Sequence, residues 1–207
     1  MSTGRFITFE GGEGVGKSTL VAAVATALKA RGIDPVCTRE PGGVALAEAV
    51  RELVLFPPAE GDWDPVSRAL LMNAARVEHL VSLIRPALTV GKWVLSDRFS
   101  DSTRVYQQIE GVADNQLATL ERLTLGDTRP DLTFLLDAAP EALLKRRSQR
   151  GVVDAFEAKP VDFHIAVREA FLALAEGEPE RVVRVDALQS PEQMCSAVMT
   201  EIRHRFL

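Results

Sequence analysis

Short apolar runs alternate along this 207-residue chain with longer segments in which apolar residues recur every three or four positions. The short runs carry the β-branched and aromatic residues of buried strands and lie at 5–10, 33–38, 93–96, 132–136 and 182–185. The longer segments have helical periodicity and lie at 19–31, 46–55, 66–90, 115–125, 140–150, 162–176 and 191–205. This order predicts an α/β fold, with a doubly wound five-stranded parallel sheet and helices on both faces.

One proline and two polar connections interrupt the pattern. Pro86 lies inside the longest helical segment and predicts a kink or break there. The stretch 57–64 is a loop, and 151–160 is a second polar connection that we expect to move. Neither separates two folding units, so we expect one domain over residues 1–207.

The composition argues against several classes of ligand and location. The formal net charge is −5 and no stretch is dense in Lys and Arg, whereas a nucleic-acid polymer needs a basic surface. No apolar run reaches the length of a membrane span. Cys37 and Cys195 lie far apart without a C-x-x-C pattern, which indicates thiols in a reducing compartment, so we expect the cytoplasm.

A glycine-rich segment predicts a phosphate-binding loop. Residues 11–18 (GGEGVGKS) fit G-x-x-x-x-G-K-[ST] and lie between a predicted strand and a predicted helix. In that position the backbone N–H groups surround an anion, the lysine reaches the outer phosphates and the serine hydroxyl holds Mg²⁺. An ordinary glycine-rich turn is disfavoured by the flanking elements. The predicted nucleotide-binding residues are Gly11, Gly12, Glu13, Gly14, Val15, Gly16, Lys17, Ser18 and Thr19.

Polar residues follow several predicted strands, at the edge of the sheet where ligands bind in doubly wound folds. Arg39 follows the second strand, Asp97 and Arg98 the third, and Asp137 the fourth. Phosphoryl transfer needs a strand-end carboxylate for Mg²⁺ and cations for the transferred group. We favour Asp97 over Asp137 as the carboxylate, because Arg98 adjoins it and is suited to an acceptor phosphate.

Other candidate residues have an ordinary interpretation beside the functional one. Glu13 either faces solvent or accepts a hydrogen bond from a sugar hydroxyl. Met72 and Arg76 share a helical face that suits a nucleobase, although a core methionine beside a surface arginine has the same spacing. Basic residues at the predicted helix end before 151–160 suit a helix C-terminus, or they bring charge to the phosphoryl group; they are Arg146, Arg147 and Arg150.

Longer motifs resemble those of the thymidylate kinases, P-loop enzymes that phosphorylate dTMP to dTDP with ATP. The resemblance covers nearly the whole chain, and its most specific parts are TREPGG at 38–43 and SDRFSDSTRVYQ at 96–107. The other parts are FEGGEGVGKST at 9–19, LLMNAARVEHL at 70–80, RPDLTFLLD at 129–137 and AFEAK at 155–159. It implies a P-loop kinase domain with a lid near 147–160, MgATP as donor in dTTP biosynthesis, and a homodimer.

The resemblance also implies roles for individual residues. The implied dTMP site consists of Glu13, Arg39, Met72, Arg76, Arg98, Thr103, Tyr106 and Gln107. Arg39 and Arg98 would contact the phosphate, Glu13 the sugar, and Arg76 with Thr103 the thymine. Tyr106 would lie against the deoxyribose and disfavour a 2′-hydroxyl. Mg²⁺ would be held by Ser18 and Asp97, and the implied catalytic residues are Lys17, Asp97, Arg98 and Arg150.

The chain departs from the family pattern at three positions. Met72 stands where a phenylalanine usually stacks on thymine, and Gln108 replaces a glycine. Ala155 stands where the lid motif D-R-x-E has its arginine, so that Arg150, or one of the two arginines before it, is the candidate substitute. These departures leave two alternatives, a kinase with a changed base preference and a nucleotide-binding protein that has lost catalysis.

Overall fold

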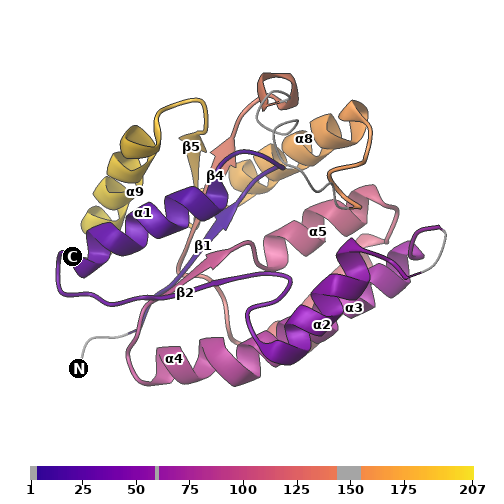
Figure 1. Ribbon diagram of the computed structural model, residues 1–207, viewed down its shortest axis with the longest axis horizontal. Coiled ribbons are helices and arrows are strands. Elements are labelled where there is room, and N and C mark those ends of the chain that lie inside the picture. The colour runs from indigo at the N-terminus through magenta and orange to yellow at the C-terminus, as the bar shows by residue number, and fades with distance from the viewer. Residues whose placement is uncertain (1–3, 59–60, 144–154) are drawn as a thin grey trace.

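A single parallel sheet organises the protein, whose computed structural model describes residues 4–58, 61–143 and 155–207 (Figure 1). The strand order is β2-β3-β1-β4-β5, and every neighbouring pair is parallel. The strands are β1 (Phe6–Glu10), β2 (Val36–Arg39), β3 (Val94–Asp97), β4 (Leu132–Asp137) and β5 (Val182–Asp186). The predicted five-stranded, doubly wound sheet is therefore confirmed.

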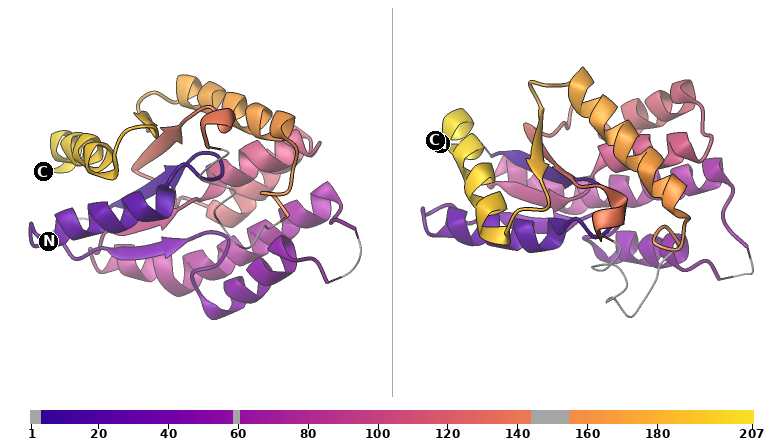
Figure 2. Two further views of the ribbon diagram at one scale, coloured as in Figure 1. Left: turned by 45° about the horizontal axis from the view of Figure 1, so that its top comes forward. Right: turned by 90° about the horizontal axis from the view of Figure 1, so that it is seen from above.

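Helices cover both faces of the sheet (Figure 2). They are α1 (Lys17–Lys29), α2 (Ala45–Leu55), α3 (Pro65–His79), α4 (Arg85–Thr89), α5 (Ser100–Ile109), α6 (Asp114–Leu125), α8 (Val161–Gly177) and α9 (Pro191–Phe206). Helices α1 and α9 pack together on one face, and α3, α5 and α8 lie on the other. None of the helices in the described part of the chain has the length and apolar character of a membrane span.

Alternation along β1 puts apolar residues alone on one face, and Phe6 with two polar residues on the other. Ile7 and Phe9 enter the core beneath α1 and α9. On the opposite face, Thr8 is fully buried and its hydroxyl lies 2.7 Å from that of Thr133 on β4. Glu10 follows on this same face, towards α5. Burying polar groups costs free energy unless they are hydrogen-bonded, and apolar residues would fill a core without that cost. The polar residues on this face therefore indicate a role beyond core packing.

The predicted helix over 66–90 contains the expected break, but the irregularity precedes Pro86. After α3 the chain forms a π turn (Leu80–Ile84), in which the N–H of Arg85 donates to the carbonyl of Leu80. Pro86 then occupies the first turn of α4. Because proline has no N–H, it is tolerated at a helix start and disrupts a helix interior. The π turn therefore ends α3, and Pro86 lies at the start of the next helix, α4.

Other predicted boundaries were partly wrong. The strand predicted over 33–38 begins only at Val36, and α1 begins at Lys17 rather than at Thr19. The helix predicted over 140–150 is described only for 140–143, and its remainder lies outside the described residues. Helix α5 was missed, because it opens with short polar residues and its buried face is partly polar, with Asp101, Thr103 and Gln107. Its apolar residues are few, although they do gather on one helical face, so the low apolar content rather than a missing periodicity hid this helix.

Candidate active site

The glycine-rich loop connects β1 to α1, as the sequence predicts. Gly11 has φ 132°, and a Cβ there would clash with the carbonyl oxygen of Leu136, so glycine is required for this close approach. The first turn of α1 has neither a capping side chain nor an acidic residue, which leaves its backbone N–H groups available to an anion. Lys17 lies over the loop and donates to the carbonyls of Gly11 at 3.1 Å and Gly12 at 2.8 Å.

Ser18 and Asp97 place two oxygen ligands side by side. The Ser18 hydroxyl donates to Asp97 Oδ2 at 2.5 Å, across the neighbouring ends of β1 and β3. Hydroxyl and carboxylate oxygens next to a phosphate loop fit Mg²⁺, which keeps water and phosphate as its other ligands. In the described ranges no group of three His, Cys, Asp or Glu side chains is placed to hold a metal ion. These residues therefore suit a cation that arrives with a nucleotide.

Asp137, the alternative carboxylate, is already engaged by two arginines. Arg168 Nε donates to its Oδ1 at 2.7 Å, and Arg184 Nη2 donates to its Oδ2 at 2.6 Å. Burial favours a higher pKa for Asp137, but the hydrogen bonds and charges of these arginines outweigh it and lower the pKa below 3.8. Asp137 is thus an ionised carboxylate whose charge is neutralised within the fold.

A pocket of about 90 Å³ opens beside the phosphate loop. Helices α2, α3 and α5 and the segment before α8 contribute its walls. Its lining residues are Glu13, Glu40, Pro41, Arg51, Leu55, Met72, Arg76, Arg98, Phe99, Ser102, Thr103, Tyr106, Gln107 and Phe156. All but one of the predicted dTMP-binding residues therefore line one cavity, which we call the acceptor pocket.

Arg98 connects the acceptor pocket with the phosphate loop. Its guanidinium donates to the Gly11 carbonyl at 2.9 Å and to Glu13 Oε1 at 2.5 Å. The Tyr106 hydroxyl also donates to Glu13 Oε1, at 3.1 Å. Burial works to raise the pKa of Glu13, but the charges of Arg98 and Lys17 outweigh it and lower the pKa to about 2. Glu13 is therefore an ionised acceptor at neutral pH, and it faces the pocket rather than solvent.

Arg76 is held rigidly in the pocket wall. Its Nε donates to Glu40 Oε2 at 2.8 Å, and its Nη2 donates to Thr103 Oγ1 at 2.8 Å and to the Phe99 carbonyl at 3.2 Å. Only 3% of Arg76 is exposed. Met72, one helical turn earlier, lines the same cavity. Arg76 and Thr103 are therefore paired at the pocket wall, and the ordinary interpretation of a surface arginine is wrong.

Gln107 presents a buried acceptor without a partner. Its Nε2 donates to Glu110 Oε2 at 3.2 Å, whereas its Oε1 has no hydrogen-bond partner in the described part of the protein. Gln107 is fully buried and lines the acceptor pocket. An unpaired buried oxygen at a cavity wall is satisfied when a ligand donates to it.

Arg39 is the predicted site residue that does not line the acceptor pocket. It is half exposed, and its guanidinium forms an ion pair with Glu48 of α2 at 2.9 Å. Strand alternation explains this position, since Thr38 faces inward and Arg39 outward. Arg51, which the sequence analysis missed, lines the pocket instead and donates to the Pro41 carbonyl at 2.8 Å. Its position four residues before Leu55 on α2 was the available signal.

Only part of the predicted lid belongs to the described residues. Arg146, Arg147 and Arg150 lie outside them. Phe156 is 5% exposed, lines the acceptor pocket, and contacts the Tyr106 ring edge-to-face at 5.3 Å. The end of the predicted lid is therefore part of the pocket wall.

Comparisons with known proteins agree with this geometry. The thymidylate kinase family model matches residues 9–198. A thymidylate kinase of Chromohalobacter salexigens is 48% identical, and the match covers 99% of this chain and 98% of the relative. One of Magnetococcus marinus is 45% identical over 98% of this chain and 97% of the relative. A crystal structure of thymidylate kinase from Ehrlichia chaffeensis superposes with a TM-score of 0.77 at 31% identity, covering 96% of this chain and 98% of that one. The chain belongs to the thymidylate kinase family.

Proposed function

We propose that this thymidylate kinase transfers the γ-phosphoryl group of MgATP, bound on the phosphate loop, to dTMP bound in the acceptor pocket. The observation that supports this arrangement most is the position of Arg98. Its guanidinium contacts Gly11 in the loop and Glu13 in the pocket, a position that would lie between the two nucleotides. A cation there attracts both the acceptor phosphate and the transferred group.

Catalysis in this scheme depends on position and on charge. Lys17 neutralises the donor phosphates, and Ser18 with Asp97 would hold Mg²⁺. The ion would supply charge to the β- and γ-phosphates and help align them. The acceptor phosphate attacks in line, and no covalent enzyme intermediate forms. The protein therefore contributes by orienting two anions that repel each other.

We assign recognition of the base to hydrogen-bond donors and to a hydrogen-bond acceptor in the pocket wall. Arg76 and Thr103 present donors at one side of the pocket, suited to a carbonyl of thymine. The unpaired Gln107 Oε1 suits the N3–H of thymine, a donor that cytosine lacks. Met72 covers the ring by dispersion and sulfur contact. Tyr106 lies under the deoxyribose, and its hydrogen-bonded partner Glu13 accepts from the sugar.

The proposed lid spans about 147–160, of which the structure describes 155–160. Arg150 would supply the charge that Ala155 does not, because it is the nearest arginine before the segment that ends at the pocket wall. Arg39 would join the acceptor phosphate only after leaving Glu48. Arg51 already lines the pocket and is the additional candidate for that phosphate.

We further propose that residues 1–207 form one kinase domain that acts as a cytoplasmic homodimer. The supporting observation is an exposed apolar stripe along α3 and the following π turn, formed by Val66, Leu70, Val77 and Val81. Their spacing puts them on one helical face, and such stripes mark contact surfaces. A second copy of this chain is the partner expected from the family. Sedimentation equilibrium would return the mass of a monomer if this assignment is wrong.

Coupled ADP release with dTMP and MgATP tests the proposed function. We expect turnover by the wild type and loss of at least about a thousandfold in Lys17→Ala. Among the described residues the Lys17 ammonium donates only to loop carbonyls, so the variant should unfold at nearly the same temperature. Activity of Lys17→Ala within a few fold of wild type would remove the phosphate loop from the mechanism.

A further inference from the structure

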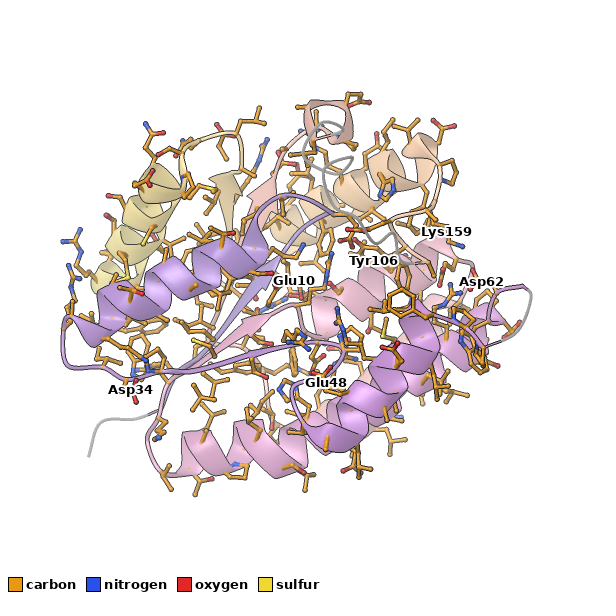
Figure 3. The ribbon with its side chains drawn as sticks, in the orientation of Figure 1. Glu10, Asp34, Glu48, Asp62, Tyr106 and Lys159 are labelled. Carbon is orange, nitrogen blue, oxygen red and sulfur yellow. The ribbon has the colours of Figure 1, made fainter. Side chains whose placement is uncertain are left out.

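Glu10 is a buried carboxylate that lies behind the wall of the acceptor pocket and is not itself one of its lining residues. It ends β1 and is 1% exposed (Figure 3). A buried carboxylate is costly unless its oxygens accept hydrogen bonds. The Phe99 N–H donates to its Oε1 at 2.7 Å and the Ser102 hydroxyl donates to its Oε2 at 2.6 Å. Both partners belong to the start of α5.

Glu10 caps α5 from a neighbouring strand. The N-cap residue of α5 is Phe99, and no side chain within that segment caps the helix. The N–H groups of Phe99 and Ser102 instead point at Glu10 Oε1, the second at 3.4 Å. A negative charge at a helix N-terminus also interacts favourably with the helix dipole. The position of α5 against the sheet therefore depends on this carboxylate.

The residue just before this cap has an unusual backbone conformation. Arg98 has φ 71°, and in the described ranges it is the only residue other than glycine with a positive φ. Such a conformation is disfavoured for an arginine and persists only where its surroundings enforce it. The Arg98 N–H donates to the Phe9 carbonyl at 2.9 Å, and the Ser96 hydroxyl donates to the Arg98 carbonyl at 2.7 Å. Glu10 holds the next N–H, so the turn is fixed on both sides.

Glu10 also reaches the Arg98 side chain through one hydroxyl. Ser102 Oγ donates to Glu10 and accepts from Arg98 Nη1 at 2.9 Å. The carboxylate thus determines the orientation of the serine, and the serine restrains the guanidinium. Burial and the Asp101 charge raise the pKa of Glu10 to about 7, while the charge of Arg98 opposes the rise.

We propose that Glu10 is the positioning residue for Arg98: it fixes the backbone of Arg98 through Phe99 and its guanidinium through Ser102, so that the cation faces the transferred phosphoryl group. This inference rests on the proposed function of Arg98. The proposed role adds to the active site a residue that touches neither nucleotide. It also explains why an acidic residue is buried behind a loop that binds anions.

The test compares Glu10→Gln and Ser102→Ala with the wild type. Glutamine keeps the shape of Glu10 and an oxygen for the Phe99 N–H, so the variant should fold, but it presents an amide instead of an acceptor to Ser102. We expect kcat/KM for dTMP to fall about 10- to 100-fold, the effect of a misplaced catalytic group. The KM for ATP should stay within about twofold of wild type. Because both residues act on one cation, the double variant should lose little more than the larger single effect.

Asp131→Asn is the matched control. Asp131 accepts from the Phe6 N–H at 2.7 Å, at the opposite end of the same strand, and lies outside the acceptor pocket. We expect this variant to keep the kinetic constants of the wild type. If Glu10→Gln lowers only the unfolding temperature and leaves kcat and KM unchanged, Glu10 is merely structural and the proposal is wrong. If the wild type and Asp131→Asn themselves do not use dTMP, the proposed function fails, and this inference fails with it.

Discussion

Two carboxylates at neighbouring strand ends should respond in opposite ways to the same substitution. Asp97 contacts Ser18 of the phosphate loop, whereas Asp137 contacts Arg168 and Arg184. Asp97→Asn should therefore impair catalysis and spare the fold. Asp137→Asn should destabilise the fold and spare catalysis.

The expected magnitudes follow from these contacts. Loss of a charged metal-site oxygen costs at least about 100-fold in activity, or about 2.7 kcal/mol of transition-state stabilisation. Asp137 loses two arginine partners, but Arg168 and Arg184 are 35% and 59% exposed, so solvent screening reduces each pair to about 1 kcal/mol. A total of about 2 kcal/mol corresponds to a Tm lower by about 4–8 °C for a chain of this size.

Kinetics and unfolding of both variants, with Mg²⁺ varied, test this contrast. Asp97→Asn should need more Mg²⁺ for half-maximal rate and should unfold near the wild-type temperature. Asp137 contributes stability above its unfolded-state pKa of 3.8, and this contribution is lost as pH falls through its lower folded-state pKa. The Tm difference between Asp137→Asn and the wild type should therefore shrink as the pH falls below 3.8. The assignment is refuted if Asp137→Asn is the more catalytically impaired variant, or if its Mg²⁺ requirement rises.

Further predictions concern the base pocket and the lid. Met72→Phe should lower the KM for dTMP by roughly two- to tenfold, since aromatic pairs gain about 0.5–1.5 kcal/mol beyond burial. The preference for dTMP over dCMP should stay the same. A higher KM for dTMP would mean that the side chain at position 72 does not stack on the base. Arg76→Ala should reduce the preference for dTMP over dCMP. Because Glu40 loses a buried partner in this variant, the assay is run well below the unfolding temperature of the variant. Arg150→Ala should lower kcat far more than it raises KM, as for an interaction made in the transition state. An unchanged kcat would transfer that role to Arg146 or Arg147.

The sheet was predictable because buried parallel strands appear as apolar runs, and the phosphate loop because its glycines and lysine form a local pattern. Helix α5 was not predictable in this way, since its buried residues include polar ones such as Thr103 and Gln107, which line the site instead of packing in the core. Thr103, Tyr106 and Gln107 came from the resemblance alone, whereas the other dTMP-site residues were already candidates from strand ends, the phosphate loop or helical spacing. The apolar residues of α5 are few but lie on one face, so a search for periodicity at low apolar content was the available signal.

Tertiary placement accounts for the remaining differences. Whether Arg39 or Arg51 reaches the acceptor pocket depends on strand alternation and on the ion pair with Glu48, which no local pattern reveals. The role of Glu10 requires knowing that β1 ends beside the start of α5. The π turn before Pro86 arises because the helix must change its hydrogen bonding ahead of a residue without an N–H.

Competition among monophosphates tests the central claim most directly. The enzyme is given MgATP with equimolar dTMP, dUMP, dCMP and dGMP in one reaction, and the diphosphates are separated and quantified over the first turnovers. A pocket that pairs Arg76 and Gln107 with thymine predicts dTDP as the main product and the least product from dCMP and dGMP. Preferential formation of another diphosphate, or no diphosphate at all, would contradict the account.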